Sequence, residues 1–106
     1  MTSLCRKNTT EIYFKSRGSV GNCSFVGCSA NGRGGAIYFW NDGSVGNCSF
    51  VGCSASVYGG AIYFRDGGSM SSVNYCIFDN NKADNGSAIY SISDSVDVGY
   101  NFFGWV

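Results

Sequence analysis

One ten-residue sequence occurs twice in this chain, and it limits the folds that the chain can adopt. The letters "GNCSFVGCSA" occupy residues 21–30 and return at residues 46–55. The match extends in both directions, because "GSV" precedes each copy and "GGAIYF" follows each copy after a few residues. Position 21 corresponds to position 46, and every one of these matches shows the same shift. A period of about 20 to 50 residues is the signature of solenoids, propellers and repeat arrays.

Weaker copies extend the repeat over most of the chain. The letters "IYF" at residues 12–14 lie one full period before the "IYF" at residues 37–39. After a three-residue insertion around Ser71, the order Val, Cys, Phe, Ala returns and is followed by "GSAIY" at residues 86–90. Residues 98–103 are predicted to form a last half copy. The chain therefore consists of about four copies of one unit of roughly 25 residues.

Composition indicates which repeat architecture this is. The chain has 16 Gly and no Pro, and the segments between glycines are too short for helices of the usual length. Each unit offers two short runs of β-branched and aromatic residues between turn residues, which are typical of strands. A propeller blade needs about 40 to 45 residues, and a leucine-rich repeat needs spaced leucines, whereas Leu4 is the single leucine. The sequence predicts an all-β, right-handed parallel β-helix in which coils pair about 4.8 Å apart.

The alternation along each run predicts which side chains face the interior. One interior stack is expected to contain the isoleucines Ile12, Ile37, Ile62 and Ile89, with Phe14, Phe39 and Phe64 beside them. In the last copy Ser91 replaces the aromatic residue. A second stack is expected to contain Phe25, Phe50, Phe78 and Phe103. Val20 and Cys23 can both face inward only if the chain bends at residues 21–22. Each buried aromatic or isoleucine side chain contributes about 1.5 to 3 kcal/mol, so these stacks are expected to stabilise the fold.

Five of the six cysteines fall on the repeat. Cys23, Cys48 and Cys76 share one column, and Cys28 and Cys53 share another. Four residues separate the cysteines within each copy, a wider spacing than zinc-binding pairs favour, and the chain has no histidine. Buried free thiols are therefore the main prediction. The first alternative is a disulfide between coils, because the coil spacing permits it, and the second is a metal site. The main prediction includes no metal and no cofactor.

Catalysis would require converging carboxylates. The candidates are Asp42 and Asp66, near the same turn of neighbouring coils, with Arg17 and Arg65 close in register. Each aspartate precedes a glycine, which is typical of turns, and no histidine is available for a nucleophilic triad. We therefore predict no catalytic residues. A fragment of a polysaccharide-active β-helix enzyme is the alternative.

A binding surface is predicted on the outward face. If the isoleucines point inward, then Tyr13, Tyr38, Tyr63 and Tyr90 form an exposed column, with Trp40 on the same side. Such a column is a candidate platform for a glycan or a partner protein. The alternative is that the rings pack on one another and merely cover the sheet. Four Asn-x-Ser/Thr sequons offer glycan acceptors in an exported protein, at Asn8, Asn22, Asn47 and Asn85.

The repeat motifs resemble those of two families. The pairing of "GGAIY" with Phe-x-x-Asn or Phe-x-x-Cys resembles the repeats of chlamydial polymorphic outer-membrane proteins. The segments "CSFVGCSA", "NNKADNGSAIY" and "YNFFG" are similar to segments of adhesin-like surface proteins of methanogenic archaea. Both resemblances imply a β-helix that is displayed on the cell surface or secreted. At the Phe-x-x-Asn position the chain carries Cys28 and Cys53 and has asparagine only at Asn81, which argues against a continuous asparagine ladder.

The resemblance and the bounds of the repeat give the expected organisation. Residues 1–11 form a poorly defined N-terminal segment, and residues 12–106 form one repeat domain that is expected to be part of a longer chain with neighbouring coils. No signal peptide and no run of 18 apolar residues is found in this sequence. The formal net charge of zero argues against electrostatic binding to a nucleic acid or a membrane surface, and no membrane insertion of this segment is expected. The expected role is structural or adhesive, with a passive spacer stalk as a further alternative.

Overall fold

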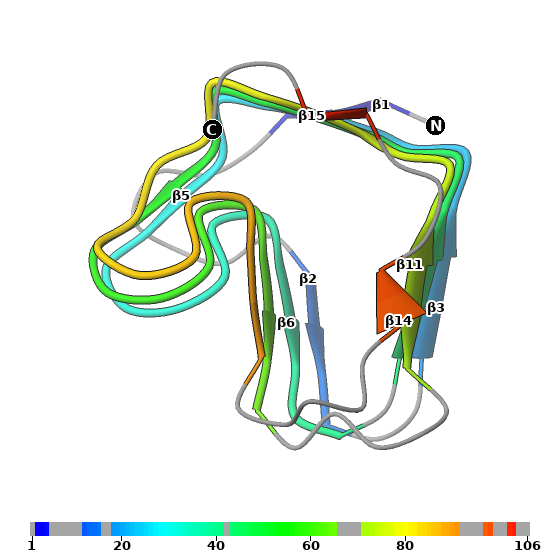
Figure 1. Ribbon diagram of the computed structural model, residues 1–106, viewed down its shortest axis with the longest axis horizontal. Helices are drawn as coiled ribbons and strands as arrows, with labels where there is room; N and C mark the ends of the chain where they lie inside the picture. Colours follow the sequence, from blue (N-terminus) through cyan, green and yellow to red (C-terminus); the bar gives the residue numbers. More distant parts are fainter. Residues whose placement is uncertain are drawn as a thin grey trace.

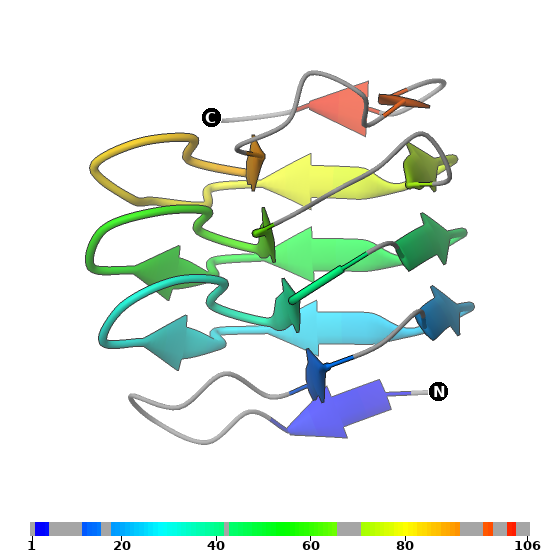
Figure 2. The same cartoon turned by 90° about the horizontal axis from the view of Figure 1, so that it is seen from below.

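The computed structural model describes residues 2–4, 12–15, 18–41, 43–65, 71–91, 97–98 and 102–103. Throughout these residues the regular structure is β-strand, and every strand pairing is parallel. Successive coils lie one above the other (Figure 2). Seen down the coil axis, the chain runs counterclockwise as its later coils approach the viewer, so the coil is right-handed (Figure 1). The predicted parallel β-helix is confirmed.

Three sheets form the walls of the solenoid, and a short fourth sheet lies in loops that project from one side (Figure 1). The first sheet contains β1 (Thr2–Leu4), β4 (Ser24–Val26), β8 (Ser49–Val51), β12 (Ile77–Asp79) and β15 (Phe102–Phe103). The second contains β2 (Ile12–Phe14), β6 (Ile37–Phe39), β10 (Ile62–Phe64) and β13 (Ile89–Ser91). The third contains β3 (Gly18–Gly21), β7 (Gly43–Gly46), β11 (Ser72–Asn74) and β14 (Asp97–Val98), and the short sheet pairs β5 (Ser29–Ala30) with β9 (Ser54–Ala55).

The strand register follows the sequence period. Ile62 pairs with Ile37 on one side and with Ile89 on the other. Val73 pairs with Val45, so the register continues past the predicted insertion. The last half copy also continues the ladder, since Phe78 of β12 pairs with Phe103 of β15. Identical residues of neighbouring coils therefore lie above one another.

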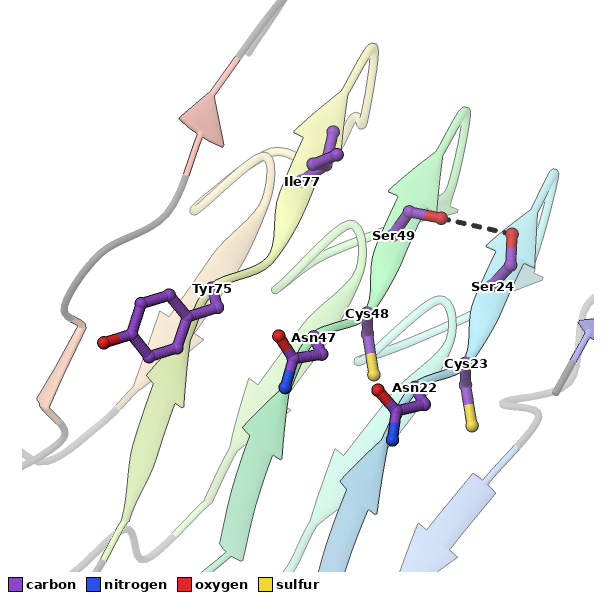
Figure 3. Close-up of a pocket in the computed structure, with 8 residues that line it drawn as sticks. All are labelled: Asn22, Cys23, Ser24, Asn47, Cys48, Ser49, Tyr75 and Ile77. Atoms are coloured by element: carbon purple, nitrogen blue, oxygen red, sulfur yellow. Dashed lines mark hydrogen bonds between the residues drawn. The ribbon is translucent and has the colours of Figure 1, made fainter.

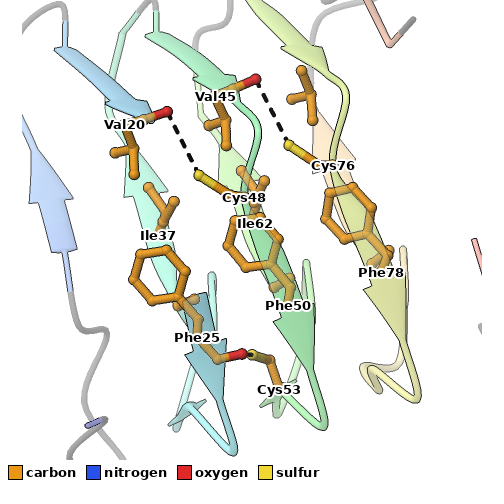
Figure 4. Close-up of a cluster of buried hydrophobic side chains, with 14 of the residues drawn as sticks. Val20, Phe25, Ile37, Val45, Cys48, Phe50, Cys53, Ile62, Cys76 and Phe78 are labelled. Atoms are coloured by element: carbon orange, nitrogen blue, oxygen red, sulfur yellow. Dashed lines mark hydrogen bonds between the residues drawn. The ribbon is translucent and has the colours of Figure 1, made fainter. Parts of the chain in front are cut away.

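The interior consists of the predicted stacks (Figure 4). The rings of Phe25, Phe50 and Phe78 are fully buried and stack with centroids 5.0 Å apart at each step. Phe39 and Phe64 stack in the same way, with centroids 4.8 Å apart. Ile37 and Ile62 are also fully buried, whereas the partly buried members lie toward the ends of the stacks and are Ile12, Phe14 and Ile89.

The predicted bend at residues 21–22 is confirmed, and its cause is a left-handed residue at the corner. Asn22 has a φ of 55°, and its equivalents Asn47 and Tyr75 have φ values of 54° and 56°. Asparagine tolerates this region better than most residues that carry a side chain. The turn allows Val20 and Cys23, on either side of it, both to be buried.

The two glycines of "GGAIY" have different roles. The first adopts a positive φ in each copy, at Gly34, Gly59 and Gly86, a conformation that glycine reaches without steric cost. The second packs against the next coil, because a Cβ atom on Gly35 would overlap the carbonyl oxygen of Gly60. A Cβ atom on Gly60 would likewise overlap the carbonyl oxygen of Ser87. The motif therefore fixes how closely the projecting loops can stack.

Asn81 makes one rung of the hydrogen bonding that an asparagine ladder would repeat. Its side-chain oxygen accepts from the Cys53 backbone N–H at 2.9 Å, and its amide donates to the Phe50 carbonyl at 3.1 Å. In the coil below, the Cys53 thiol takes the donor role and lies 3.7 Å from the Phe25 carbonyl oxygen. The ladder does not continue, as the sequence indicated, because a thiol supplies the donor but no amide oxygen.

The cysteine prediction is partly wrong. Cys23, Cys48, Cys53 and Cys76 are buried free thiols, but Cys28 is disulfide-bonded. The thiols of the first column donate to backbone carbonyl groups two residues earlier, as Cys48 does to Gly46 at 3.3 Å. Burial raises the pKa of Cys53 to about 11, so this thiol stays protonated at neutral pH. Among the described residues, no three side chains of the metal-binding types converge.

Candidate aromatic binding face

The four predicted tyrosines form a column on the outer face of the second sheet. Tyr13, Tyr38, Tyr63 and Tyr90 occupy equivalent positions of β2, β6, β10 and β13 and pair in register. Their ring centroids are 4.7, 4.9 and 5.8 Å apart from the first coil to the last. The structure thus brings the predicted residues together.

The prediction that this whole column is exposed is wrong at Tyr63, which is only 2% exposed. A second layer covers it, since the Tyr58 ring lies 6.0 Å from Tyr63 and 4.4 Å from Tyr90. The Arg33 guanidinium also lies over Tyr58 and Tyr63, at 5.5 and 5.7 Å from the ring centroids. Burial raises the pKa of Tyr63. The covering residues come from the projecting loops, which the strand alternation does not describe.

Ring stacking also limits what the column can bind. The Tyr13 ring stacks on Tyr38, with the two ring planes 20° apart, and so covers one face of Tyr38. The Tyr63 ring also packs against Tyr38, at a tilt of 51°, so neighbouring rings limit the access of a ligand to Tyr38. Tyr13, at 46% exposed, is the most accessible of the four rings. The alternative prediction, that the rings pack on one another, describes the upper part of the column.

A second column runs beside the tyrosines and contains Lys15, Trp40 and Arg65. Each residue directly follows an inward phenylalanine of its own coil. The backbone N–H of Trp40 donates to the Phe14 carbonyl, and that of Arg65 donates to the Phe39 carbonyl, both at 2.8 Å. The Arg65 guanidinium carbon lies 3.9 Å from the centroid of the Trp40 ring. Sequence reasoning missed Lys15, although a step of one period back from Trp40 finds it.

A surface hollow of about 370 Å³ opens where the two columns meet in the lower coils. It is lined by Tyr13, Lys15, Trp40 and Asn41. The Asn41 side-chain amide donates to the Lys15 carbonyl at 3.0 Å, which holds this loop residue against the coil below. Trp40 is 37% exposed. The hollow therefore combines accessible aromatic surface with a cation and an amide, and it is the candidate binding site.

A second hollow, of about 470 Å³, lies at the corner where the third sheet meets the first (Figure 3). The side chains of Asn22 and Asn47 lie side by side on successive coils, and the Ser49 hydroxyl donates to the Ser24 hydroxyl at 3.1 Å. Both asparagines are exposed, as is Asn85, so three sequons lie at the surface. The sequon at Asn8 lies outside the described residues.

Of the residues considered for catalysis, the structure describes Arg65 alone. Arg65 stacks on Trp40 and is part of the aromatic face. Asp42, Asp66 and Arg17 lie outside the described residues. That Asp42 and Asp66 are turn residues without a catalytic role therefore stays a prediction. No helix that is long and apolar enough to cross a membrane occurs among the described residues.

Comparison with known proteins gives a match to a family of repeats. Residues 75–92 match the repeat of the Chlamydia polymorphic membrane protein family. The matched segment contains Asn81 and "GSAIY", and it belongs to the copy in which the Phe-x-x-Asn motif is intact. This finding supports the resemblance to polymorphic membrane protein repeats, a kind of surface-protein repeat. No curated protein and no solved structure matches the chain, and nothing found supports the similarity to archaeal adhesin-like proteins.

Proposed function

We propose that this chain is a non-catalytic repeat segment of a secreted or surface-displayed, adhesin-like protein, which binds a glycan or a partner protein through its aromatic face. The repeat match at residues 75–92 supports the surface-protein class. The hollow between Tyr13 and Trp40 carries the binding part of the proposal. Neighbouring coils of a longer chain would extend the same columns, because each coil pairs with the next in register.

Two other functions remain in competition with this one. A passive spacer needs the same stacked coils but no exposed aromatic residue. A polysaccharide-active enzyme needs a cleft with converging carboxylates. The described hollow is lined by aromatic, lysine and asparagine side chains, which are suited to holding a ligand.

A single experiment distinguishes the three. The chain is incubated with a panel of immobilised neutral and acidic polysaccharides, and both retention and new reducing ends are measured. Retention without new reducing ends is expected for a binding segment. New reducing ends would overturn the proposal in favour of an enzyme, and a chain that neither binds nor cleaves any member of the panel, or any surface protein tested in parallel, is a spacer.

A further inference from the structure

The main aromatic wall of the hollow is the Trp40 indole ring, of which only one face is open to a ligand. Arg65 belongs to the coil above Trp40 and covers one face of its indole ring. Tyr13 and Lys15 belong to the coil below, so the hollow lies against the opposite side of the indole. The Tyr13 ring, tilted by 50° to the Trp40 ring at a centroid distance of 6.4 Å, forms an adjoining wall. A flat ligand can therefore contact Trp40 and Tyr13 together.

The charges described on this face are all positive. Lys15 lines the hollow, Arg65 backs its indole wall, and Arg33 lies over the tyrosines farther along the column. The described carboxylates lie elsewhere, at Asp79 in β12 and Asp84 in a projecting loop. Asp42 and Asp66 follow the site in sequence and lie outside the described residues. Lys15, the cation that lines the hollow, is thus complementary to an anionic group of a ligand.

Building on the proposed function, we infer that this hollow binds a carboxylated sugar ring of an acidic polysaccharide. The apolar face of a pyranose ring suits the walls made by Trp40 and Tyr13. The carboxylate suits the Lys15 ammonium, which makes a charge-assisted hydrogen bond. Asn41 supplies an amide at the mouth for a hydroxyl group. A nucleic acid offers the same two features, but it needs a basic domain, whereas this chain has no net charge and a pI of about 6.0.

The test compares binding of polygalacturonate with that of a neutral galactan and of single-stranded DNA. The chain is expected to bind polygalacturonate most tightly, with an affinity that falls as salt is raised. Trp40→Ala is expected to weaken this binding about tenfold, and Lys15→Gln about threefold with loss of the preference for the acidic polymer. Tyr75→Ala removes an exposed ring at the corner between β11 and β12 and is expected to leave binding unchanged.

Each contrary outcome has a distinct meaning. Circular dichroism of the variants checks that the coils remain, and Trp40→Phe, which restores an aromatic wall, is expected to recover most of the binding. Polysaccharide binding that Trp40→Ala leaves unchanged would overturn this site but leave the proposed function intact. Equal binding of the neutral polymer, or tighter binding of DNA, would overturn the assignment of the ligand. Cleavage of any polymer would overturn the proposed function itself.

Discussion

Replacing Gly60 with alanine is expected to destabilise the chain by about 3 kcal/mol or more. A Cβ atom at this position would overlap the carbonyl oxygen of Ser87 and would lie 2.8 Å from the backbone nitrogen and oxygen of Lys82. All three contacts are with the backbone of the next coil, so no side chain can move aside. The projecting loops must then separate or shift out of register. Urea unfolding followed by circular dichroism measures the effect.

Gly32 provides the matched control in the same kind of loop. A Cβ atom on Gly32 meets no atom within 4 Å, and its φ lies outside the left-handed region. Gly32→Ala is therefore expected to change the free energy of unfolding by no more than about 0.5 kcal/mol. Equal stability of the Gly60 and Gly32 variants would contradict the close stacking of the loops.

Replacing Asn81 with alanine is expected to destabilise the chain, because two buried backbone groups lose their hydrogen bonds to the Asn81 side chain. These groups are the N–H of Cys53 and the carbonyl of Phe50. A buried polar group that loses its partner costs about 1 to 3 kcal/mol, and this cost is expected for the Cys53 N–H. The Phe50 carbonyl still pairs with β12 in the parallel ladder, so the loss there is smaller. Because Asn81 is only 5% exposed, water has little access to replace the amide. The midpoint of urea unfolding should fall accordingly.

Asn81→Cys gives a graded comparison, because cysteine occupies the equivalent position in the coil below. The thiol is expected to donate to Phe50 as Cys53 donates to Phe25. It cannot accept well from the Cys53 N–H, so most of the loss should remain. If alanine and cysteine are equally harmful, the side-chain donor contributes nothing, and if both match the unmodified chain, the rung does not stabilise the fold.

The repeat was sufficient to predict the fold because identical residues stack on identical residues. Phe25 and Phe50 are one period apart in sequence and paired in the structure, and the same holds for Ile37 and Ile62. The corner at Asn22 could be predicted from the alternation of side chains along a strand, because Val20 and Cys23 could not both face inward if the strand were straight. Each of these conclusions depends either on the repeat period or on the two-residue alternation of inward and outward side chains. Both can be read directly from a sequence.

The site was harder to predict because its exposure depends on groups outside that periodicity. Tyr63 is buried by Tyr58, which comes from a projecting loop rather than from a strand. Cys28 is disulfide-bonded, whereas the coil spacing permits free and bonded cysteines equally. Lys15 lies one period before Trp40, so its place beneath Trp40 could be predicted, but the hollow that it lines could not. Position along a column was predictable, and accessibility was not.

The stacking of coils in the register of the sequence repeat underlies the core, the aromatic face and the proposed binding site. Nuclear Overhauser effects between backbone protons of the isotope-labelled chain test it most directly. We expect contacts between the strands of Phe25 and Phe50, and between those of Ile37 and Ile62, in the pattern of parallel pairing. Contacts in an antiparallel pattern, or backbone pairing of Phe25 with the strand of Ile37, would contradict the β-helix and with it the shared face of Tyr13 and Trp40.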